Sequence, residues 1–308
     1  MIYTLCLSPA IDYNMYIDKV VVDGINKSNS ETFHAGGKGI NVSIVLKNLG
    51  VESVCLGFLG GFTGKYIKDY LDSKKIKNDF VWIDSDTRIN VKIKGISGET
   101  AIDGMGPVVK RRFLDELFIK LDKLKHGDML VLSGNTCKGI SDTIYEEILS
   151  RIDKDVVIVV DSVRYLLYSS LKYKPLFVKP NKDELEEVLN VKISDDRDLV
   201  SASLKLQELG AQNVIVSLGK DGAMLLDSKK HISFIKPNSD RDVVNTIGCG
   251  DSVVAGVIAK YLKNNDMKEA TMYGAASGCA SAYSEHFGVV EDIEDIFKNK
   301  LEVKEFIY

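Results

Sequence analysis

Short apolar runs and amphipathic stretches follow one another in a regular order through the second half of the chain. Apolar runs typical of buried strands lie at 129–132, 156–160, 176–178 and 214–216. Helical patterns accompany them, at 109–124, 142–152, 182–189 and 196–209. This alternation predicts an α/β fold, in which helices cover both faces of a mostly parallel sheet. Such sheets bind ligands beyond the carboxyl ends of their strands, where polar residues stand in this chain.

An earlier segment, residues 11–17, alternates between apolar and polar side chains. The alternation predicts a strand with one polar face, and Asp12 lies on that face. Residues 1–7, which precede it, have the apolar pattern of a buried strand. Two interpretations of Asp12 are open, because a carboxylate on such a face is either solvated or a ligand of a bound molecule.

A second alternating segment, residues 88–94, has positive charge on its polar face. Isoleucine and valine alternate there with Arg88, Asn90 and Lys92. Gly98-Glu99 is expected to turn this strand into an antiparallel partner. The cationic face suits an anionic ligand, although an edge strand that lysine protects from aggregation has the same pattern.

Two glycine-rich turns enter helical patterns. The first is Gly36-Gly37-Lys38-Gly39-Ile40-Asn41, and Gly50 ends the helix that follows it. Glycines let a ligand approach the main chain closely. A lysine at a helix N-terminus is disfavoured by the helix dipole, so Lys38 suggests an anionic partner. The alternative is a solvated lysine beside a tight turn.

The second turn is Gly248-Cys249-Gly250-Asp251. A glycine-rich turn at a helix start directs unpaired N–H groups at one point, which suits a phosphate or an oxygen that gains charge during phosphoryl transfer. Asp251 could take the proton of an attacking hydroxyl. The alternative is an ordinary helix start with Asp251 as its N-cap. A thiol at such a position is expected to have a lowered pKa, which would make Cys249 reactive. The alternative is a buried, small apolar residue that never meets solvent.

Three further segments have both a structural and a functional interpretation. Asn181 and Glu184 stand three positions apart at a helix start, where they could serve a hydrated Mg²⁺ or form a capping box. Residues 217–223 suit a nucleotide-binding hairpin or an ordinary one. The glycine- and alanine-rich helix 274–282 could leave room for an adenine ring, or could pack tightly against the helix that Asp251 opens.

Composition limits the classes of function. The 308 residues are 45% hydrophobic and 27% charged, which suits a globular protein with a sizeable core. The net charge of −4 argues against nucleic-acid and anionic-membrane partners. The five cysteines form no Cys-x-x-Cys pair, so we expect reduced thiols rather than disulfides or a zinc site. Without a leader or an apolar run of membrane length, we expect a cytoplasmic protein.

Together, the two glycine-rich turns and the Asn181-x-x-Glu184 pair resemble the ribokinase-like (PfkB) carbohydrate kinases, in order and at family-like spacing along the whole chain. Lys38 with the segment 87–92 is similar to the branch that acts on sugar phosphates. The resemblance implies ATP-dependent phosphorylation of fructose 1-phosphate at its 6-hydroxyl, which gives fructose 1,6-bisphosphate. The alternatives are tagatose 6-phosphate or fructose 6-phosphate as the acceptor, or a catalytically idle sugar-phosphate sensor.

The resemblance also implies roles for individual residues. Asp251 would be the base, and the N–H groups of Gly248, Cys249 and Gly250 would form the anion hole. Residues implied to bind the sugar phosphate are Asp12, Gly36, Gly37, Lys38, Asn41, Arg88 and Asn90. Residues implied to bind the nucleotide are Asn181, Ser217, Gly219, Lys220, Gly222, Gly248 and Gly250. Glu184 would hold Mg²⁺ through water.

The family fold implied is a three-layer ribokinase-like domain over 1–308, with a small β-sheet lid from about 11–34 and 87–104. In relatives the lid often joins two subunits, so we expect a homodimer. The chain departs from the family pattern at 133–137 and at 161–164. Both departures bear on the identity of the substrate, and Arg164 is a candidate for an additional phosphate ligand.

Overall fold

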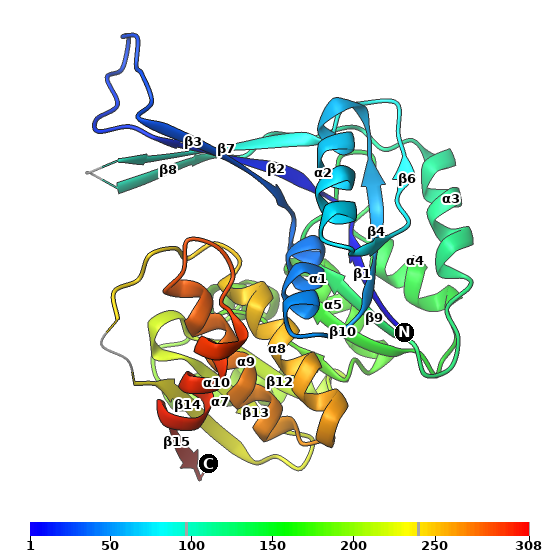
Figure 1. Ribbon diagram of the computed structural model, residues 1–308. Coiled ribbons are helices and arrows are strands. Elements are labelled where there is room, and N and C mark those ends of the chain that lie inside the picture. The colour runs from blue at the N-terminus through cyan, green and yellow to red at the C-terminus, as the bar shows by residue number, and fades with distance from the viewer. Residues whose placement is uncertain (96–97, 239–240, 308) are drawn as a thin grey trace.

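In the computed structural model, which describes residues 1–95, 98–238 and 241–307, a large sheet forms the centre of the molecule (Figure 1). Its strands lie in the order β15 (Leu301–Phe306), β14 (Ile232–Pro237), β13 (Ala223–Leu226), β12 (Val214–Ser217), β11 (Phe177–Val178), β10 (Val157–Asp161), β9 (Met129–Ser133), β1 (Ile2–Cys6), β4 (Ser53–Leu59) and β5 (Lys77–Asn78). The strand β6 (Val81–Trp82) also pairs with β4. Pairing is parallel from β5 to β12 and antiparallel from β12 to β15, which confirms the predicted mostly parallel sheet.

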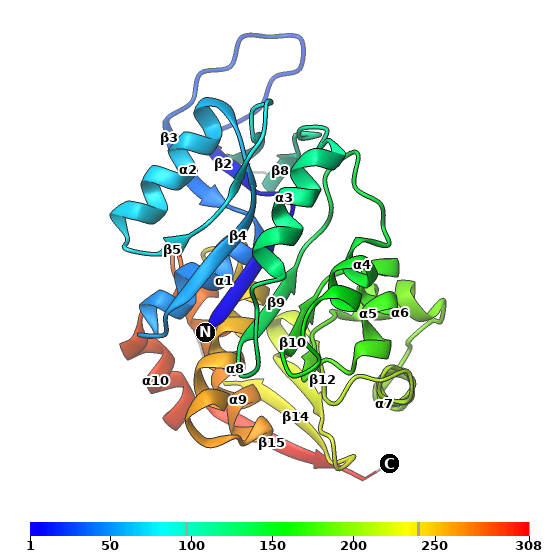
Figure 2. The ribbon, with the colours of Figure 1, turned by 90° about the vertical axis from the view of Figure 1, so that its right-hand side faces the viewer.

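Helices cover both faces of this sheet (Figure 2). One face carries α3 (Arg111–Leu121), α4 (Ile144–Arg151), α5 (Arg164–Ser170), α6 (Lys182–Leu189) and α7 (Asp196–Glu208). The other carries α1 (Lys38–Asn48), α2 (Gly61–Ser73), α8 (Cys249–Asn264) and α9 (Met267–Ala282), with α10 (Val290–Asn299) packed against α9. Short 3₁₀ turns are η1 (Leu171–Tyr173) and η2 (Gly219–Asp221). None of the helices in the described ranges is long and apolar enough to cross a membrane.

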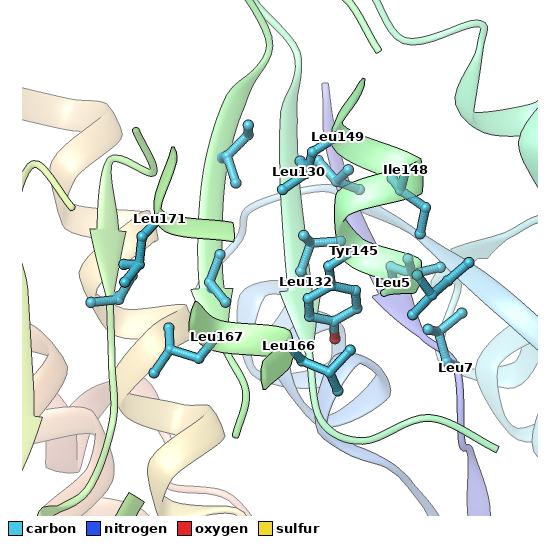
Figure 3. Close-up of a cluster of buried hydrophobic side chains, with 14 of the residues drawn as sticks. Leu5, Leu7, Leu130, Leu132, Tyr145, Ile148, Leu149, Leu166, Leu167 and Leu171 are labelled. Carbon is cyan, nitrogen blue, oxygen red and sulfur yellow. The ribbon is translucent and has the colours of Figure 1, made fainter. Parts of the chain in front are cut away.

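The central strands divide their side chains between the two helical layers, because successive residues of a strand point to opposite faces. On β9, Leu130 and Leu132 belong to the core beneath α3–α7, where they lie near Tyr145 of α4 (Figure 3). Met129 and Val131 belong to the core beneath α1 and α8. Burying a leucine side chain fully contributes about 1.5–3 kcal/mol. Burial on both faces explains why this strand is continuously apolar in the sequence.

Small residues bring α8 and α9 into close contact. A Cβ atom added to Gly256 would lie 2.9 Å from the Cα atom of Gly274. One added to Gly274 would lie 2.5 Å from Cγ2 of Val257 and 2.8 Å from the carbonyl oxygen of Val253. The tight packing expected of the glycine- and alanine-rich helix is therefore confirmed.

A smaller sheet, called here the lid sheet, projects from the large one (Figure 1). Its strands lie in the order β3 (Ser30–Gly36), β2 (Ala10–Tyr16), β7 (Arg88–Gly95) and β8 (Gly98–Ile102). The strands predicted from the alternating segments are confirmed. The turn predicted at Gly98-Glu99 is wrong, because these two residues pair with Gly95 and Lys94 inside the sheet.

The two faces of the lid sheet differ in polarity, as the alternation predicts. The register aligns His34, Asp12 and Asn90 in a polar row. The neighbouring apolar row consists of Phe33, Tyr13, Val91 and Ile102. Asp12 and Asn90 are buried, so the interpretation of Asp12 as a solvated residue is wrong.

Candidate active site

The site centres on Asp251 in the first turn of α8. The N-cap of this helix is Gly248, whose φ of 73° is left-handed, so the alternative of Asp251 as the N-cap is wrong. The carboxylate is buried, and Asn41 Nδ2 donates to its Oδ2 at 2.7 Å. Burial, followed by the negative charge of Asp161, raises the pKa of Asp251 to about 6. A base with a pKa near 6 can be ionised at neutral pH and can still hold a proton.

Lys38 and Asn41 lie at the start of α1, which packs against α8, and Asn41 reaches Asp251. Lys38 Nζ lies 3.5 Å from Asp161 Oδ1 and 3.7 Å from Glu184 Oε1. The charge of Asp161, and then that of Glu184, raises the pKa of Lys38 although burial opposes the shift. The ammonium is therefore held among carboxylates of the protein at the centre of the site. Binding of an external anion by Lys38 stays a prediction.

Asp161 and Lys179 are polar residues at strand ends, where the sequence pattern places a ligand site, but no role was predicted for either. Asp161 ends β10 and is fully buried, while Lys179 directly follows β11 and has a side chain 4% exposed. Lys179 Nζ lies 3.2 Å from Asp161 Oδ1, so this oxygen is close to two ammonium groups. In the sequence, each is a charged residue at the carboxyl end of an apolar strand, which is where such sheets bind ligands. This position is the feature that points to a role in the site.

Asn181 and Glu184 form the predicted capping box at the start of α6. Asn181 accepts a hydrogen bond from the Glu184 N–H, and Glu184 Oε2 accepts one from the Asn181 N–H at 2.8 Å. The other carboxylate oxygen, Oε1, is the one that lies near Lys38. In the described part of the chain, no group of three or more histidine, cysteine or acidic residues could hold a metal ion by itself. A lone carboxylate still fits Mg²⁺, which keeps several waters and takes its other ligands from substrate phosphates.

Some of the residues implied for the nucleotide line one cavity of about 780 Å³. They are Asn181, Ser217 and Gly219. Lys220 lies in η2, which connects β12 to β13 as the predicted hairpin requires. Gly222 has a φ of 88°, and a Cβ atom there would lie 2.0 Å from the carbonyl oxygen of Ile235. Glycine is therefore needed at this position for the hairpin itself.

The polar face of the lid sheet reaches the same region as Asn41. A cavity of about 290 Å³ is lined by Asp12, His34, Asn41 and Lys92, among others. Asn90 Nδ2 donates to Asp12 Oδ1 at 2.9 Å, and Lys92 Nζ lies 3.6 Å from Asp12 Oδ2. Asn90 therefore holds Asp12 in place. Lys92 is a further cation of this cavity, although the family resemblance implied no role for it.

Close packing explains why two positions of the first glycine-rich turn are glycine. A Cβ atom at Gly36 would lie 2.4 Å from Asp12 Oδ2. Gly37 has a φ of 113°, and a Cβ atom there would lie 2.6 Å from Cys6 Sγ. Any larger residue would displace Asp12 or the end of β1, so the turn needs glycine at both positions.

Arg88 begins β7 of the lid sheet. Its Nη1 donates to the carbonyl oxygen of Gly104 at 3.3 Å, and its Nη2 to that of Ser8 at 3.4 Å. The Nε atom is buried without a hydrogen-bond partner among the described residues. An unpaired buried donor of a permanently charged group suits an anionic ligand. The other candidate, Arg164, does not join it, because it is exposed and pairs with Glu187 at 2.7 Å.

The expectation of a lowered pKa for Cys249 is wrong. The thiol is half-buried, and its Sγ lies 3.4 Å from the carbonyl oxygen of Asn245, to which the neutral thiol donates. Burial, and then the charge of Asp251, raises the pKa of Cys249 to about 11. Helix N–H groups would stabilise a thiolate, but here the neighbouring carboxylate and the loss of water outweigh them.

Comparison with known proteins agrees with this geometry. A family model described as pfkB family carbohydrate kinase matches residues 3–294. The chain is 38% identical to the 1-phosphofructokinase of Borreliella burgdorferi over 294 residues, which cover 96% of this chain and 95% of that protein. It is 33% identical to a tagatose-6-phosphate kinase of Staphylococcus epidermidis over 306 residues, covering 97% and 98%.

A solved structure of Escherichia coli phosphofructokinase-2 with substrates and products superimposes with a TM-score of 0.91 at 25% identity, covering 96% of this chain and 98% of that one. The likeness therefore extends through both the large sheet and the lid sheet. Since one family model and these relatives match almost the whole chain, the protein belongs to the pfkB family of carbohydrate kinases.

Proposed function

We propose that this ATP-dependent carbohydrate kinase phosphorylates fructose 1-phosphate at its 6-hydroxyl, giving fructose 1,6-bisphosphate and ADP. One observation carries the reaction type: a buried carboxylate, Asp251, has a pKa of about 6 at a glycine-rich helix start and feels the charge of Lys38. The substrate follows from the 1-phosphofructokinase relative and from the unpaired Nε of Arg88, which suits the phosphate that the sugar already carries.

In the proposed mechanism, Asp251 accepts the proton of the 6-hydroxyl while the hydroxyl oxygen attacks the γ-phosphorus of ATP. A new oxygen–phosphorus bond forms, and the bond between the γ-phosphorus and the departing oxygen of ADP breaks. Asn41 holds Asp251 in place through its 2.7 Å hydrogen bond. The N–H groups of Gly248, Cys249 and Gly250 stabilise the charge on the transferring group. Asp251 then releases its proton to solvent.

The lid side of the site would hold the sugar. Asp12 and Asn41 line one cavity, which suits ligands of the sugar hydroxyls, and the Gly36-Gly37 backbone would approach the sugar closely. Asn90 supports Asp12 by its hydrogen bond. Arg88 would bind the existing phosphate. Lys38, which lies near Glu184 and Asp161, would bind the existing phosphate of the sugar and also the transferred phosphate.

The nucleotide side would be formed by the hairpin and the start of α6. Asn181, Ser217 and Gly219 line one cavity, and Lys220 and Gly222 complete the loop beside it. Glu184 would hold Mg²⁺ through water, since one of its oxygens is turned toward Lys38 and the site centre. When bound, the metal ion would neutralise phosphate charge. We place this activity in the cytoplasm, in a single domain over 1–308 that dimerises through the lid sheet.

The test is a coupled assay of ADP release with fructose 1-phosphate, tagatose 6-phosphate and fructose 6-phosphate. We expect the highest kcat/KM with fructose 1-phosphate. A preference for tagatose 6-phosphate, the substrate in the name of the Staphylococcus epidermidis relative, would overturn the assigned substrate and leave the reaction type intact. Binding of sugar phosphate without ADP release would indicate a sensor, against which the intact base Asp251 argues.

A further inference from the structure

Two histidine rings meet at the cavity that the polar face of the lid sheet lines. His34 lies on β3 of the lid sheet, opposite Asp12, and His286 lies in the segment between α9 and α10. Their ring centroids are 4.7 Å apart, with an angle of 65° between the ring planes. Both rings line the cavity of about 290 Å³ together with Asp12 and Asn41. The proposed function gives neither histidine a role.

The segment that carries His286 is attached to the start of α8. Asn245 Nδ2 donates to the carbonyl oxygen of Glu285 at 3.2 Å. Phe287 lies against Gly248, the N-cap of α8, since a Cβ atom at Gly248 would be 2.6 Å from Cε1 of its ring. The histidine pair therefore connects the lid sheet to the glycine-rich turn of the proposed anion hole. Because the lid sheet projects from the large sheet (Figure 1), this contact sets how far the cavity is open.

Protonation decides whether the two rings attract or repel each other. Neutral aromatic rings attract each other edge to face, and one imidazolium ring is still attracted to a neutral ring. Two imidazolium rings at this separation repel each other as like charges. Burial, and then the charge of His286, lower the pKa of His34 below its ordinary value of 6.5. The closed contact therefore holds fewer protons than the two rings hold in water.

Other titratable groups face the pair from β2, β7, α2 and the segment of His286. They are Asp12, Tyr16, Lys92, Lys94, Tyr70, Lys74 and Glu285. Asp12 opposes the lowering of the pKa of His34, whereas Lys92 and Lys94 add to it. Among these residue types, histidine is the one whose charge changes between pH 5.5 and 7.5. The histidine pair is therefore the part of this cavity that responds to mild acid.

We propose that His34 and His286 form a pH-dependent contact, called here the histidine latch, which holds the lid sheet against the start of α8 at neutral pH and releases it when both rings are protonated. The proposal rests on the proposed function only in taking this cavity as the place of the sugar phosphate. When the contact opens, both rings reach water and titrate near pH 6.5, so opening takes up about one proton. The contact is therefore fully present above pH 6.5 and is lost as the pH falls below it.

The first test measures opening by hydrogen exchange in peptides that contain β3, without any substrate. After correction for the intrinsic effect of pH on exchange, opening should be roughly tenfold more frequent at pH 5.5 than at pH 7.5, since one proton is taken up. His34→Phe keeps a ring in the contact but cannot be protonated, so this difference should disappear. His126→Phe, at an exposed position, is the matched control and should retain it. Equal opening of the wild type at both pH values would overturn the proposal.

A second variant separates the pair from the burial of His34 alone. His286→Phe removes the second charge at an exposed position and leaves His34 buried as before. The pH dependence of opening should therefore weaken in this variant. If it stayed as strong as in the wild type, burial of His34 would be the whole cause, and the latch would be refuted.

The second test follows the KM for the sugar phosphate in the wild type and in His34→Phe. The ratio of the two KM values should rise by roughly tenfold from pH 7.5 to pH 5.5, because only the wild type loses the closed contact. Titration of Asp251 and of the substrate occurs in both enzymes and cancels in this ratio. A ratio that does not change with pH would contradict the proposal. The assay uses whichever sugar phosphate the wild type phosphorylates fastest, so an error in the proposed substrate leaves both tests intact.

Discussion

The carboxylate of Asp251 is buried beside Asp161, and its pKa of about 6 lies above the ordinary value of 3.8. Because the pKa is raised on folding, this group favours the folded state fully below pH 3.8 and loses that contribution as the pH rises through 6. At neutral pH the ionised form therefore opposes folding. We expect Asp251→Asn, which keeps the shape of the side chain, to lower kcat by roughly 10²–10⁴-fold and to stabilise the protein.

The gain in the free energy of unfolding should be on the order of 1–3 kcal/mol at pH 8. It should disappear as the pH approaches 4, because the wild-type carboxyl is then neutral too. Urea unfolding of both proteins at several pH values measures this difference. Asp142→Asn, at an exposed position, is the control. A gain that is the same at pH 4 and pH 8 would show that charge is not its cause.

Arg88 is the residue on which recognition of the sugar's own phosphate depends in the proposed function. A charge-assisted hydrogen bond contributes about 1.5–3 kcal/mol, so Arg88→Gln should raise the KM for the sugar phosphate by roughly 10–100-fold. The KM for ATP should stay close to that of the wild type. Steady-state kinetics with each substrate varied in turn measures both. Equal increases would mean that Arg88 supports the fold through Ser8 and Gly104 instead.

At the scale of elements, the contact between α8 and α9 holds the start of α8 in place. Gly274→Ala would place a Cβ atom 2.5 Å from Cγ2 of Val257 and 2.8 Å from the Val253 carbonyl oxygen. In an open helix the same change would stabilise by up to about 1 kcal/mol, but overpacking here should destabilise by about 1–3 kcal/mol. Thermal unfolding decides the sign. A raised Tm would show that the two helices separate without cost.

At the scale of the whole molecule, the lid sheet projects beyond the body (Figure 1). One of its faces lines the site, and the other carries the apolar row. In the apolar row, Phe33 is 48% exposed and Ile102 is 58% exposed. Apolar surface of this kind marks interaction sites, and a two-fold interface would pair it with itself. We expect Ile102→Lys to shift the 34.1 kDa chain from dimer to monomer in light scattering. Ile119→Lys on α3, also exposed, should not. A monomeric wild type would contradict the dimer.

Much of the fold was determined by the sequence alone, because its signals are local. The sequence of β9 is apolar throughout because both faces of the strand are buried. The lid strands alternate between apolar and polar residues because the two faces of the lid sheet have different surroundings. The capping box of Asn181 and Glu184 spans three positions, so its residues meet whatever the rest of the chain does. The order of the glycine-rich turns was sufficient to indicate the family. Asp251 could be proposed as a base because its place in the first helical turn follows from that same local pattern.

Only the tertiary structure decided which distant groups share the site and how much water reaches them. Lys179, Asp161 and Gly250 come from separate strands and a helix, and no spacing in the sequence brings them together. The pKa of Cys249 was predicted in the wrong direction because the helix start is local, whereas burial and the charge of Asp251 are set by packing. Asp12 was ambiguous for the same reason, since an alternating pattern gives the polarity of a face and packing decides what covers it.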